Sequence, residues 1–153
     1  MNARAVIDST CFIALERIER LELIPRLFEQ VYAPREVVDE IGSAPAWLMV
    51  QGVKNQSLHK ALRTQLDVGE SAVIALAAEL ENPTVILDEK KARRIARQMG
   101  LRVVGTVGLL LRAKREHMVP EVKSLLESLD RGGFRLSKEL RREALRLAQE
   151  GES

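Results

Sequence analysis

Aromatic residues and cysteines are scarce in this chain of 153 residues. Aromatic side chains make up only 3% of it, which argues against a protein that binds nucleic acid mainly by stacking bases on aromatic platforms. A single cysteine, Cys11, cannot form an internal disulfide, so we expect a reducing, cytoplasmic setting. The longest apolar run, 72–78, is far shorter than the roughly 20 residues that a membrane span needs, and the first residues lack the pattern of a signal peptide.

The composition is that of a folded protein. Hydrophobic residues make up 46% of the chain and charged residues 30%, which excludes a disordered protein, a collagen-like repeat and a disulfide scaffold. The length suits one domain and is short for two independent cores. We therefore expect a single domain over residues 1–153.

Positive charge is concentrated in the second half of the chain, although the net charge is only +2. Residues 89–115 contain nine basic residues and one acidic residue, and a second basic stretch follows over 131–146. This asymmetry favours a polyanionic partner such as nucleic acid. The alternative is a pair of solvated helix faces that are rich in arginine and lysine and bind nothing in particular.

Short apolar segments alternate with helical patterns along the chain. Because the apolar segments show little alternation of polar and apolar residues and each is followed by a helix, we predict an α/β fold with a parallel sheet covered on both faces. The expected strands are 5–7, 31–33, 47–53, 84–87 and 101–104. The expected helices are one after Ser9 and Thr10, then 21–28, 34–41, 58–66, 69–80, 89–99, 107–117, 120–129 and 138–149.

Four acidic residues lie at the ends of predicted elements. Asp8 and Asp88 each end a strand, and the carboxyl ends of parallel strands share one edge of a sheet. Glu40 ends a short helix and Glu70 begins another. If the four carboxylates meet, their repulsion raises their pKa values unless a cation lies between them, and oxygen ligands select Mg²⁺ or Mn²⁺.

Each of these acids also has a plain structural explanation. Asp8 and Asp88 could cap the helices that follow them, and Glu70 could interact favourably with a helix N-terminus. Glu40 could be a surface residue, and the sequence does not decide whether it or its neighbour Asp39 faces the crevice. The two histidines, in contrast, lack metal-ligand spacing, so we expect surface or structural roles for them.

Five segments of the sequence resemble the PIN-domain superfamily, and more closely its prokaryotic PIN-like members related to VapC-type toxins. The resemblance covers nearly the whole chain, and its more specific parts are GExxxIxLA from residue 69 and DxKxAR from residue 88. The segments are VIDST at 6–10, APREVVDEI at 33–41, LDVGESAVIALA at 66–77, ILDEKKAR at 86–93 and VGT at 104–106.

The resemblance implies a three-layer α/β/α fold around a central, mainly parallel sheet of four or five strands, and ribonuclease activity that depends on Mg²⁺ or Mn²⁺. By position, it implies a catalytic and metal-binding cluster, two hydroxyl groups that position water or carboxylates, and basic residues that hold substrate phosphates. The catalytic and metal-binding residues are Asp8, Glu40, Glu70 and Asp88. The hydroxyl residues are Ser9 and Thr106, and the basic residues are Lys90, Lys91 and Arg93.

Two departures from the family pattern affect the expected site. Many close relatives have paired aspartates where this chain has Asp88 and Glu89, so either could be the fourth acid, although the strand end favours Asp88. Glu70 stands where many PIN nucleases have aspartate, and its longer side chain would shift a bound ion.

The expected function is hydrolysis of phosphodiester bonds in single-stranded RNA by a metal-dependent ribonuclease, with the toxin of a toxin–antitoxin pair as one form of it. The alternative is a catalytically weak or inactive PIN fold that binds nucleic acid or a partner. Expected partners are RNA, a small antitoxin protein and a second copy of the chain, with no membrane. The helices from about residue 120 would pack on the core or form a dimer interface, and Leu125, Leu126 and Leu129 are the residues that suit either role.

Overall fold

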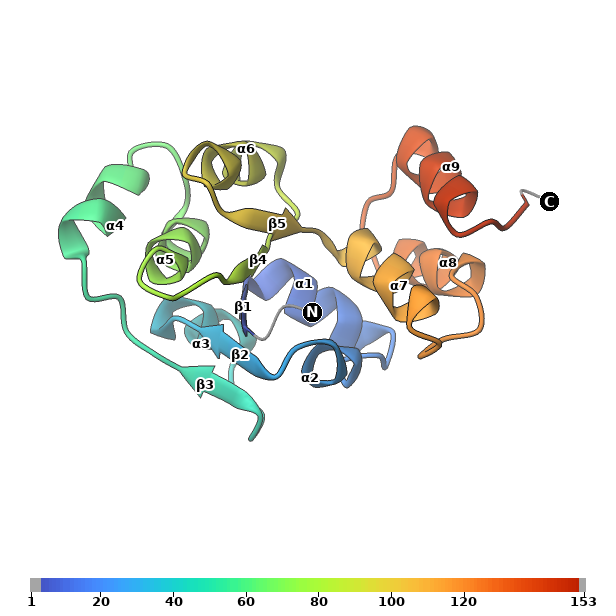
Figure 1. Ribbon diagram of the computed structural model, residues 1–153, viewed down its shortest axis with the longest axis horizontal. Coiled ribbons are helices and arrows are strands. Elements are labelled where there is room, and N and C mark those ends of the chain that lie inside the picture. Colours follow the sequence, from blue (N-terminus) through green and yellow to red (C-terminus); the bar gives the residue numbers. More distant parts are fainter. Residues whose placement is uncertain (1–3, 152–153) are drawn as a thin grey trace.

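The computed structural model describes residues 4–151, and its centre is a sheet of five parallel strands (Figure 1). The strand order is β3-β2-β1-β4-β5, with every neighbouring pair parallel. The prediction of a mainly parallel sheet is confirmed, with five strands and no antiparallel pair among the described residues. The strands are β1 (Arg4–Ile7), β2 (Gln30–Ala33), β3 (Leu48–Val50), β4 (Thr84–Ile86) and β5 (Arg102–Val104).

Nine helices connect or follow these strands within residues 4–151. Each expected helix is present, with ends that differ by a few residues from those expected. The helices are α1 (Ser9–Arg17), α2 (Leu23–Leu27), α3 (Arg35–Ile41), α4 (Gln56–Leu62), α5 (Val68–Ala77), α6 (Lys90–Gln98), α7 (Thr106–Arg115), α8 (Lys123–Arg131) and α9 (Lys138–Leu147).

The order of the strands determines which face each helix covers. The chain steps one way across the sheet from β1 to β2 and the opposite way from β3 to β4, so right-handed crossovers place the connecting helices on opposite faces. Helix α5 packs against β1 and β4, while α2 packs against β2 and α1 contacts α7. Figure 1 shows α5 on one side of the strands and α1, α2 and α7 on the other, which confirms the three-layer α/β/α fold.

Side-chain caps account for several differences between the expected and observed helix ends. Helix α4 begins earlier than expected because the side chain of Asn55 accepts a hydrogen bond of 3.0 Å from the backbone N–H of Leu58. Helix α8 begins later, at Lys123, because the carboxylate of Glu150 accepts the backbone N–H groups of Val122 and Lys123 at 2.8 and 3.0 Å. Polar groups of distant segments therefore determine ends that the hydrophobic pattern alone leaves open.

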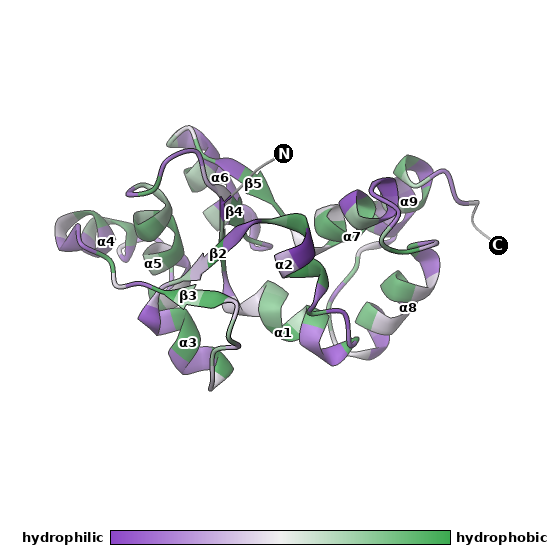
Figure 2. Ribbon diagram, turned by 60° about the horizontal axis from the view of Figure 1, so that its bottom comes forward, coloured by the Kyte–Doolittle hydropathy of each residue, from purple (hydrophilic) through white to green (hydrophobic). Residues whose placement is uncertain are grey.

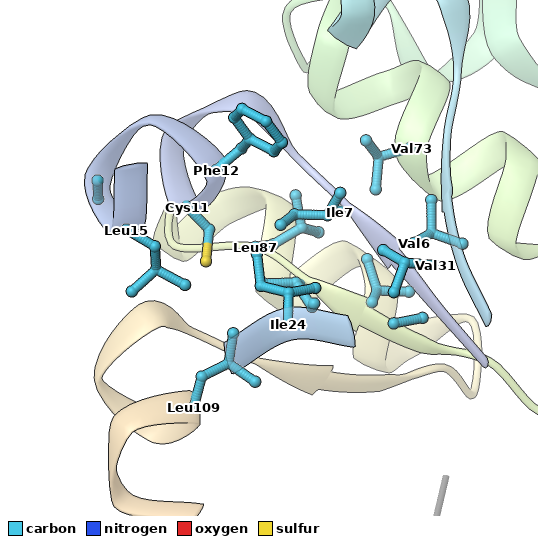
Figure 3. Packing of buried hydrophobic residues seen from close by; sticks show 14 of the residues in the cluster. Val6, Ile7, Cys11, Phe12, Leu15, Ile24, Val31, Val73, Leu87 and Leu109 are labelled. Atoms are coloured by element: carbon cyan, nitrogen blue, oxygen red, sulfur yellow. The ribbon is translucent and has the colours of Figure 1, made fainter. Parts of the chain in front are cut away.

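The hydrophobic core lies on both faces of the sheet, as expected for parallel strands. Val6 and Ile7 of β1 are completely buried. Figure 3 shows Leu15 of α1, Ile24 of α2 and Leu109 of α7 gathered on one side of the strands. Helix α5, the most apolar helix, is buried from Ser71 to Ala77. None of the helices within residues 4–151 is long and apolar enough to cross a membrane.

The three leucines of α8 belong to the chain's own core. Leu125, Leu126 and Leu129 are between 0% and 7% exposed, and α8 contacts α1. Of the two roles predicted for them, packing on the core is therefore the one that the structure shows. A dimer, which stays a prediction, would need another surface.

One buried histidine joins three helices on the α5 side of the fold. His59 of α4 is 4% exposed, and its Nε2 lies 3.0 Å from Ser71 Oγ of α5. Its Nδ1 lies 4.0 Å from Glu36 Oε2 of α3. The Ser71 hydroxyl donates to the carbonyl oxygen of Val68 and is fully buried, so this group is structural and offers no exposed nucleophile.

We predict that Leu126→Ala lowers the free energy of unfolding by about 2–5 kcal/mol, because it leaves a cavity between α8 and the core. Urea denaturation measures the change. Leu147→Ala, at a residue that is 54% exposed on α9, is the matched control and should change stability by less than about 0.5 kcal/mol. Equal losses in the two variants would contradict the core position of α8.

Candidate active site

The carboxyl ends of β1 and β4 place two aspartates at the same edge of the sheet. Asp8 directly follows β1, and its backbone N–H donates to the carbonyl oxygen of Ile86, the last residue of the neighbouring strand β4, at 3.1 Å. Asp88 lies two residues beyond that strand end. The parallel order thus places two aspartates that are 80 positions apart in the sequence at the ends of adjacent strands.

Glu40, from the end of α3, reaches the same place as Asp8. Its Oε2 accepts a hydrogen bond of 3.2 Å from the hydroxyl of Ser9, the first residue of α1. Gly69 of α5 packs directly against both carboxylates: a Cβ at this position would overlap Glu40 Oε1 and lie 3.6 Å from Asp8 Oδ1. The glycine therefore gives α5 the close approach that brings Glu70 to these two acids.

A further carboxylate, Asp67, lies at the start of α5. Its Oδ1 accepts the backbone N–H of Glu70 at 2.8 Å, which caps the helix. The sequence analysis did not include Asp67 among the site residues. The spacing of Asp67 and Glu70 is typical of a helix-capping pair and predicts where the helix starts. It does not predict that this end of the helix lies next to Asp8.

The local electrostatics are those of crowded negative charge. Burial raises the pKa of Asp8 to about 7, although a hydrogen bond from the backbone N–H of Ser9 lowers it. The carboxylates of Glu70, Asp67 and Glu40 raise the pKa of Asp8 further. Burial also raises the pKa of Glu70, to which Asp67, Glu89 and Glu40 contribute. We call Asp8, Glu40, Glu70 and Asp67 the acidic cluster.

Asp88 has a more compensated environment at the next strand end. Its Oδ1 accepts the backbone N–H of Thr106 at 2.8 Å, and its Oδ2 accepts the hydroxyl of the same residue at 2.6 Å. Burial raises the pKa of Asp88, whereas Thr106 and the guanidinium of Arg93 lower it. A Cβ at Gly105 would lie 2.5 Å from Arg93 Nη1 and 2.9 Å from Asp88 Oδ1, so glycine leaves room for this arginine.

The neighbouring acids have other positions. The carboxylate of Glu89 caps α6 by accepting the backbone N–H groups of Lys91 and Ala92 at 2.9 and 3.2 Å. Glu40, not Asp39, contacts Ser9. Asp8 is the N-cap residue of α1 but makes no capping hydrogen bond with its side chain, so capping does not account for it.

Two clefts open beside the acidic cluster. The larger, which we call the α7–α9 cleft, has a volume of about 630 Å³ and is lined by Glu70 and Asp88 at one end and by Val104, Val107 and Leu140 elsewhere. The smaller, which we call the α1 cleft, has about 340 Å³ and is lined by Ser9, Glu40 and Ile13 among others. Thr10, Gly133 and Phe134 border both clefts.

Basic residues flank the larger cleft. In Figure 1, α6 and α9 lie at the top of the view on either side of β5 and α7. Helix α6 begins with Lys90 and Lys91, both exposed, and Figure 2 shows it largely in the hydrophilic colour. Arg93 is partly buried and lines the α7–α9 cleft, as does Arg135 before α9. Two arginines therefore line the cleft together with its acidic residues, and the two lysines lie at the exposed start of α6.

The donor chemistry of the site fits a hard divalent cation, although its side chains do not form a complete coordination sphere. Among residues 4–151, no three His, Cys, Asp or Glu side chains are already placed to hold one ion. All the acids at this edge offer oxygen, the donor that Mg²⁺ and Mn²⁺ prefer. Asp8 is buried beside other carboxylates, and a cation would offset the negative charge of its ionised form.

The fold and the acidic edge define an α/β domain of the kind found in nucleases. The sequence model of one family, described as a PIN domain, matches residues 4–150. The chain therefore belongs to the PIN-domain family, whose members are in general nucleases that bind nucleic acid and typically use divalent metals. No curated protein and no solved structure matches the chain significantly.

We predict that the metal-free protein loses stability as the pH rises from about 4 to about 7. The ordinary pKa of Asp8 is 3.8, and its pKa in the folded protein is about 7, so the folded protein retains a proton that the unfolded chain releases in this window. Asp8→Asn removes this loss and should exceed the wild type in stability at about pH 8 by up to about 4 kcal/mol.

The measurement is urea denaturation in a chelator over this range of pH. Asp39→Asn, at an exposed acid on α3, is the control and should follow the wild type. A wild-type stability that is flat or rises across the window, with Asp8→Asn no more stable than the wild type above it, would be inconsistent with an uncompensated buried carboxylate.

Proposed function

We propose that the protein is a divalent-metal-dependent ribonuclease that hydrolyses phosphodiester bonds in single-stranded RNA. The observation that carries this proposal is the convergence of Asp8, Glu40 and Glu70, one of them deeply buried, beside a cleft that two arginines help to line. Membership of the PIN-domain family supports the nuclease class. Our proposal adds the substrate, single-stranded RNA, and the divalent metal to this class.

The carboxylates at the carboxyl ends of β1 and β4 would help to hold a Mg²⁺ or Mn²⁺ ion. Asp8, Glu40, Glu70 and Asp88 are the residues proposed for this role. When bound, such an ion lowers the pKa of a coordinated water and offsets the negative charge that develops on the phosphodiester. Attack by water would leave a 5′-phosphate and a 3′-hydroxyl.

Two hydroxyl residues would orient these carboxylates. Ser9 donates to Glu40, and Thr106 donates twice to Asp88, so each carboxylate has one side fixed and other lone pairs free to bind. Partners of this kind raise metal affinity by limiting the positions that a ligand can adopt. Neither hydroxyl needs to touch the substrate for this role.

The basic residues after Asp88 would hold the substrate backbone. Lys90 and Lys91 are exposed at the start of α6, and Arg93 lines the α7–α9 cleft beside Asp88. A guanidinium at this position can pair with a phosphate near the carboxylates. It also partly offsets the negative charge of Asp88. Contacts of this kind are largely independent of base sequence.

A PIN fold that binds nucleic acid without cleaving it is the second candidate. The observation that favours it is that no three metal-ligating side chains in the described part of the chain are already placed around one ion. The length of the Glu70 side chain, where many PIN nucleases have aspartate, is in keeping with a shifted or weakened metal site. Cleavage assays separate the two candidates.

We predict that the wild type cleaves a fluorophore- and quencher-labelled single-stranded RNA in Mn²⁺ or Mg²⁺ and that EDTA abolishes the cleavage. Asp8→Asn and Glu40→Gln should each lower the rate by about 100-fold or more, because each removes a charged ligand. Asp39→Asn is matched to Glu40→Gln, since it removes the adjacent acid of the same helix, and should leave the rate within about twofold of the wild type.

Binding of the RNA without cleavage in any divalent metal would support the second candidate. Cleavage that survives in Asp8→Asn and in EDTA would show a contaminating nuclease or a different mechanism. Added Mn²⁺ should also raise the melting temperature of the wild type more than that of Asp8→Asn, which reports ion binding independently of catalysis.

We predict that combined replacement of Lys90, Lys91 and Arg93 by glutamine weakens RNA binding and reduces its dependence on salt. Each lost phosphate contact should lower the slope of log affinity against log salt by about 0.7 for a single strand. Replacement of Lys54, Lys60 and Arg63, which are exposed residues around α4, removes the same charge and is the control. Equal slopes in the two triple variants would exclude the α6 contact.

A toxin restrained by a small antitoxin protein is a narrower form of the same proposal. Its test is expression in a bacterial host, where the wild type should arrest growth and Asp8→Asn should not. Normal growth with a demonstrably active enzyme would support the ribonuclease activity and exclude the role as a toxin.

A further inference from the structure

The α7–α9 cleft changes character along its length. Near the sheet edge it is lined by the carboxylates of Glu70, Asp88 and Glu89. Away from the edge its walls are mainly apolar, with Val107 and Leu111 of α7 and Leu140 of α9 among them. Glu143 of α9 also lines this part of the cleft. A nucleotide has the same division, since its phosphate is polar and its base is flat and largely apolar on both faces.

Phe134 is the one aromatic residue that lines either cleft beside the acids. Phe12 and Phe28 are each 2% exposed, and Trp47 packs against Phe12 with ring centroids 6.2 Å apart. Tyr32 lies in β2, away from both clefts. Phe134 is only partly buried and borders both clefts, so its ring lies where a strand that passes the acidic cluster would meet it.

Two hydrogen bonds and a glycine turn fix the backbone of the loop that carries Phe134. The backbone N–H of Phe134 donates to the carbonyl oxygen of Leu129 at 2.9 Å, and the guanidinium of Arg17 donates to the carbonyl oxygen of Gly132 at 3.1 Å. Gly133 has a φ of +92°, a conformation that side chains disfavour, so the turn before Phe134 depends on glycine. A loop whose backbone is held in advance loses less conformational entropy when a ligand binds.

The charges around Phe134 favour nucleic acid over an apolar peptide as the occupant. Arg93 and Arg135 both line the cleft, one beside Asp88 and the other next to Phe134 in the sequence. Phosphates on either side of a stacked base could pair with these two guanidinium groups. A purely apolar segment would offer no anionic group to these two arginines.

From this geometry we propose that Phe134 is a stacking platform for one nucleobase in the α7–α9 cleft, the base of a nucleotide whose phosphate pairs with Arg93 beside the acidic cluster. The proposal rests on the proposed function for the class of substrate, a single-stranded RNA. It adds a binding subsite and a cause for single-strand preference, because a base inside a duplex is already stacked and cannot enter the cleft.

The experiment measures binding of a fluorescein-labelled single-stranded oligoadenylate of roughly eight nucleotides, a length within the range of single-strand sites. Binding is measured in EDTA, so that no cleavage occurs. A series of the same oligonucleotide carries one abasic position that moves along the strand. The proteins are the wild type, Phe134→Leu, Phe134→Trp and Tyr32→Leu, which replaces an aromatic residue outside the clefts.

For the wild type we expect one abasic position to weaken binding by about 5-fold or more, the usual range for a base stacked on an aromatic ring. Phe134→Leu should bind the intact strand more weakly by a similar factor and show no further loss at that position. Phe134→Trp should retain the effect, and Tyr32→Leu should behave like the wild type. Urea denaturation of Phe134→Leu separates a local loss from unfolding.

Two results would overturn the inference: no binding of the oligonucleotide by the wild type, or abasic losses that are the same in the wild type and in Phe134→Leu. If the wild type cleaves RNA in Mn²⁺ but shows no Phe134-dependent loss of binding at an abasic position, the base-stacking subsite is excluded and the nuclease activity is supported. If the Phe134-dependent loss of binding occurs in a protein that never cleaves RNA, the subsite is supported and the nuclease activity is excluded.

Discussion

The central constraint in this protein is the burial of a carboxylate among other carboxylates. Asp8 is 5% exposed, and the acids nearest to it carry the same sign of charge. In the absence of a cation, such a side chain either holds a proton or lowers the stability of the fold. The parallel sheet imposes the arrangement, because β1 lies in the middle of the strand order and its carboxyl end opens where α3 and α5 also begin or end.

The two halves of the site differ in how their charge is balanced. On the β4 side, Asp88 receives two hydrogen bonds from Thr106 and lies near Arg93, so its negative charge is largely compensated by the protein. On the β1 side, the charge of Asp8 and Glu70 has no comparable compensation. A bound cation would therefore be drawn toward Asp8, and the arginine side would be left for a phosphate.

Much of the fold could be predicted because it follows from local patterns. Short apolar runs that are each followed by a helix predict a parallel sheet, and the strand-end rule is enough to bring Asp8 and Asp88 to one edge. Local patterns do not show how one helix packs against another. The choice of Glu40 over Asp39 depends on the packing of α3 against α1, and the proximity of Asp67 depends on the close approach at Gly69.

The loop that carries Phe134 was also beyond prediction from the sequence, because its place beside the acids depends on the packing of α8 against α1 and of α9 against α7. The basic residues, in contrast, could be recognised from composition alone. Their arrangement on two sides of one cleft required the fold, since α6 and α9 are separated by β5, α7 and α8 in the chain.

The site also depends on a residue that would not contact RNA, the buried histidine whose imidazole joins α3, α4 and α5. His59 lies between the helix that bears Glu40 and the helix that bears Glu70, yet it faces no cleft described above. Its loss would let these two helices shift against each other. A random screen for inactive clones should therefore recover substitutions in α4, through the structural role that the sequence analysis expects for a histidine without metal-ligand spacing.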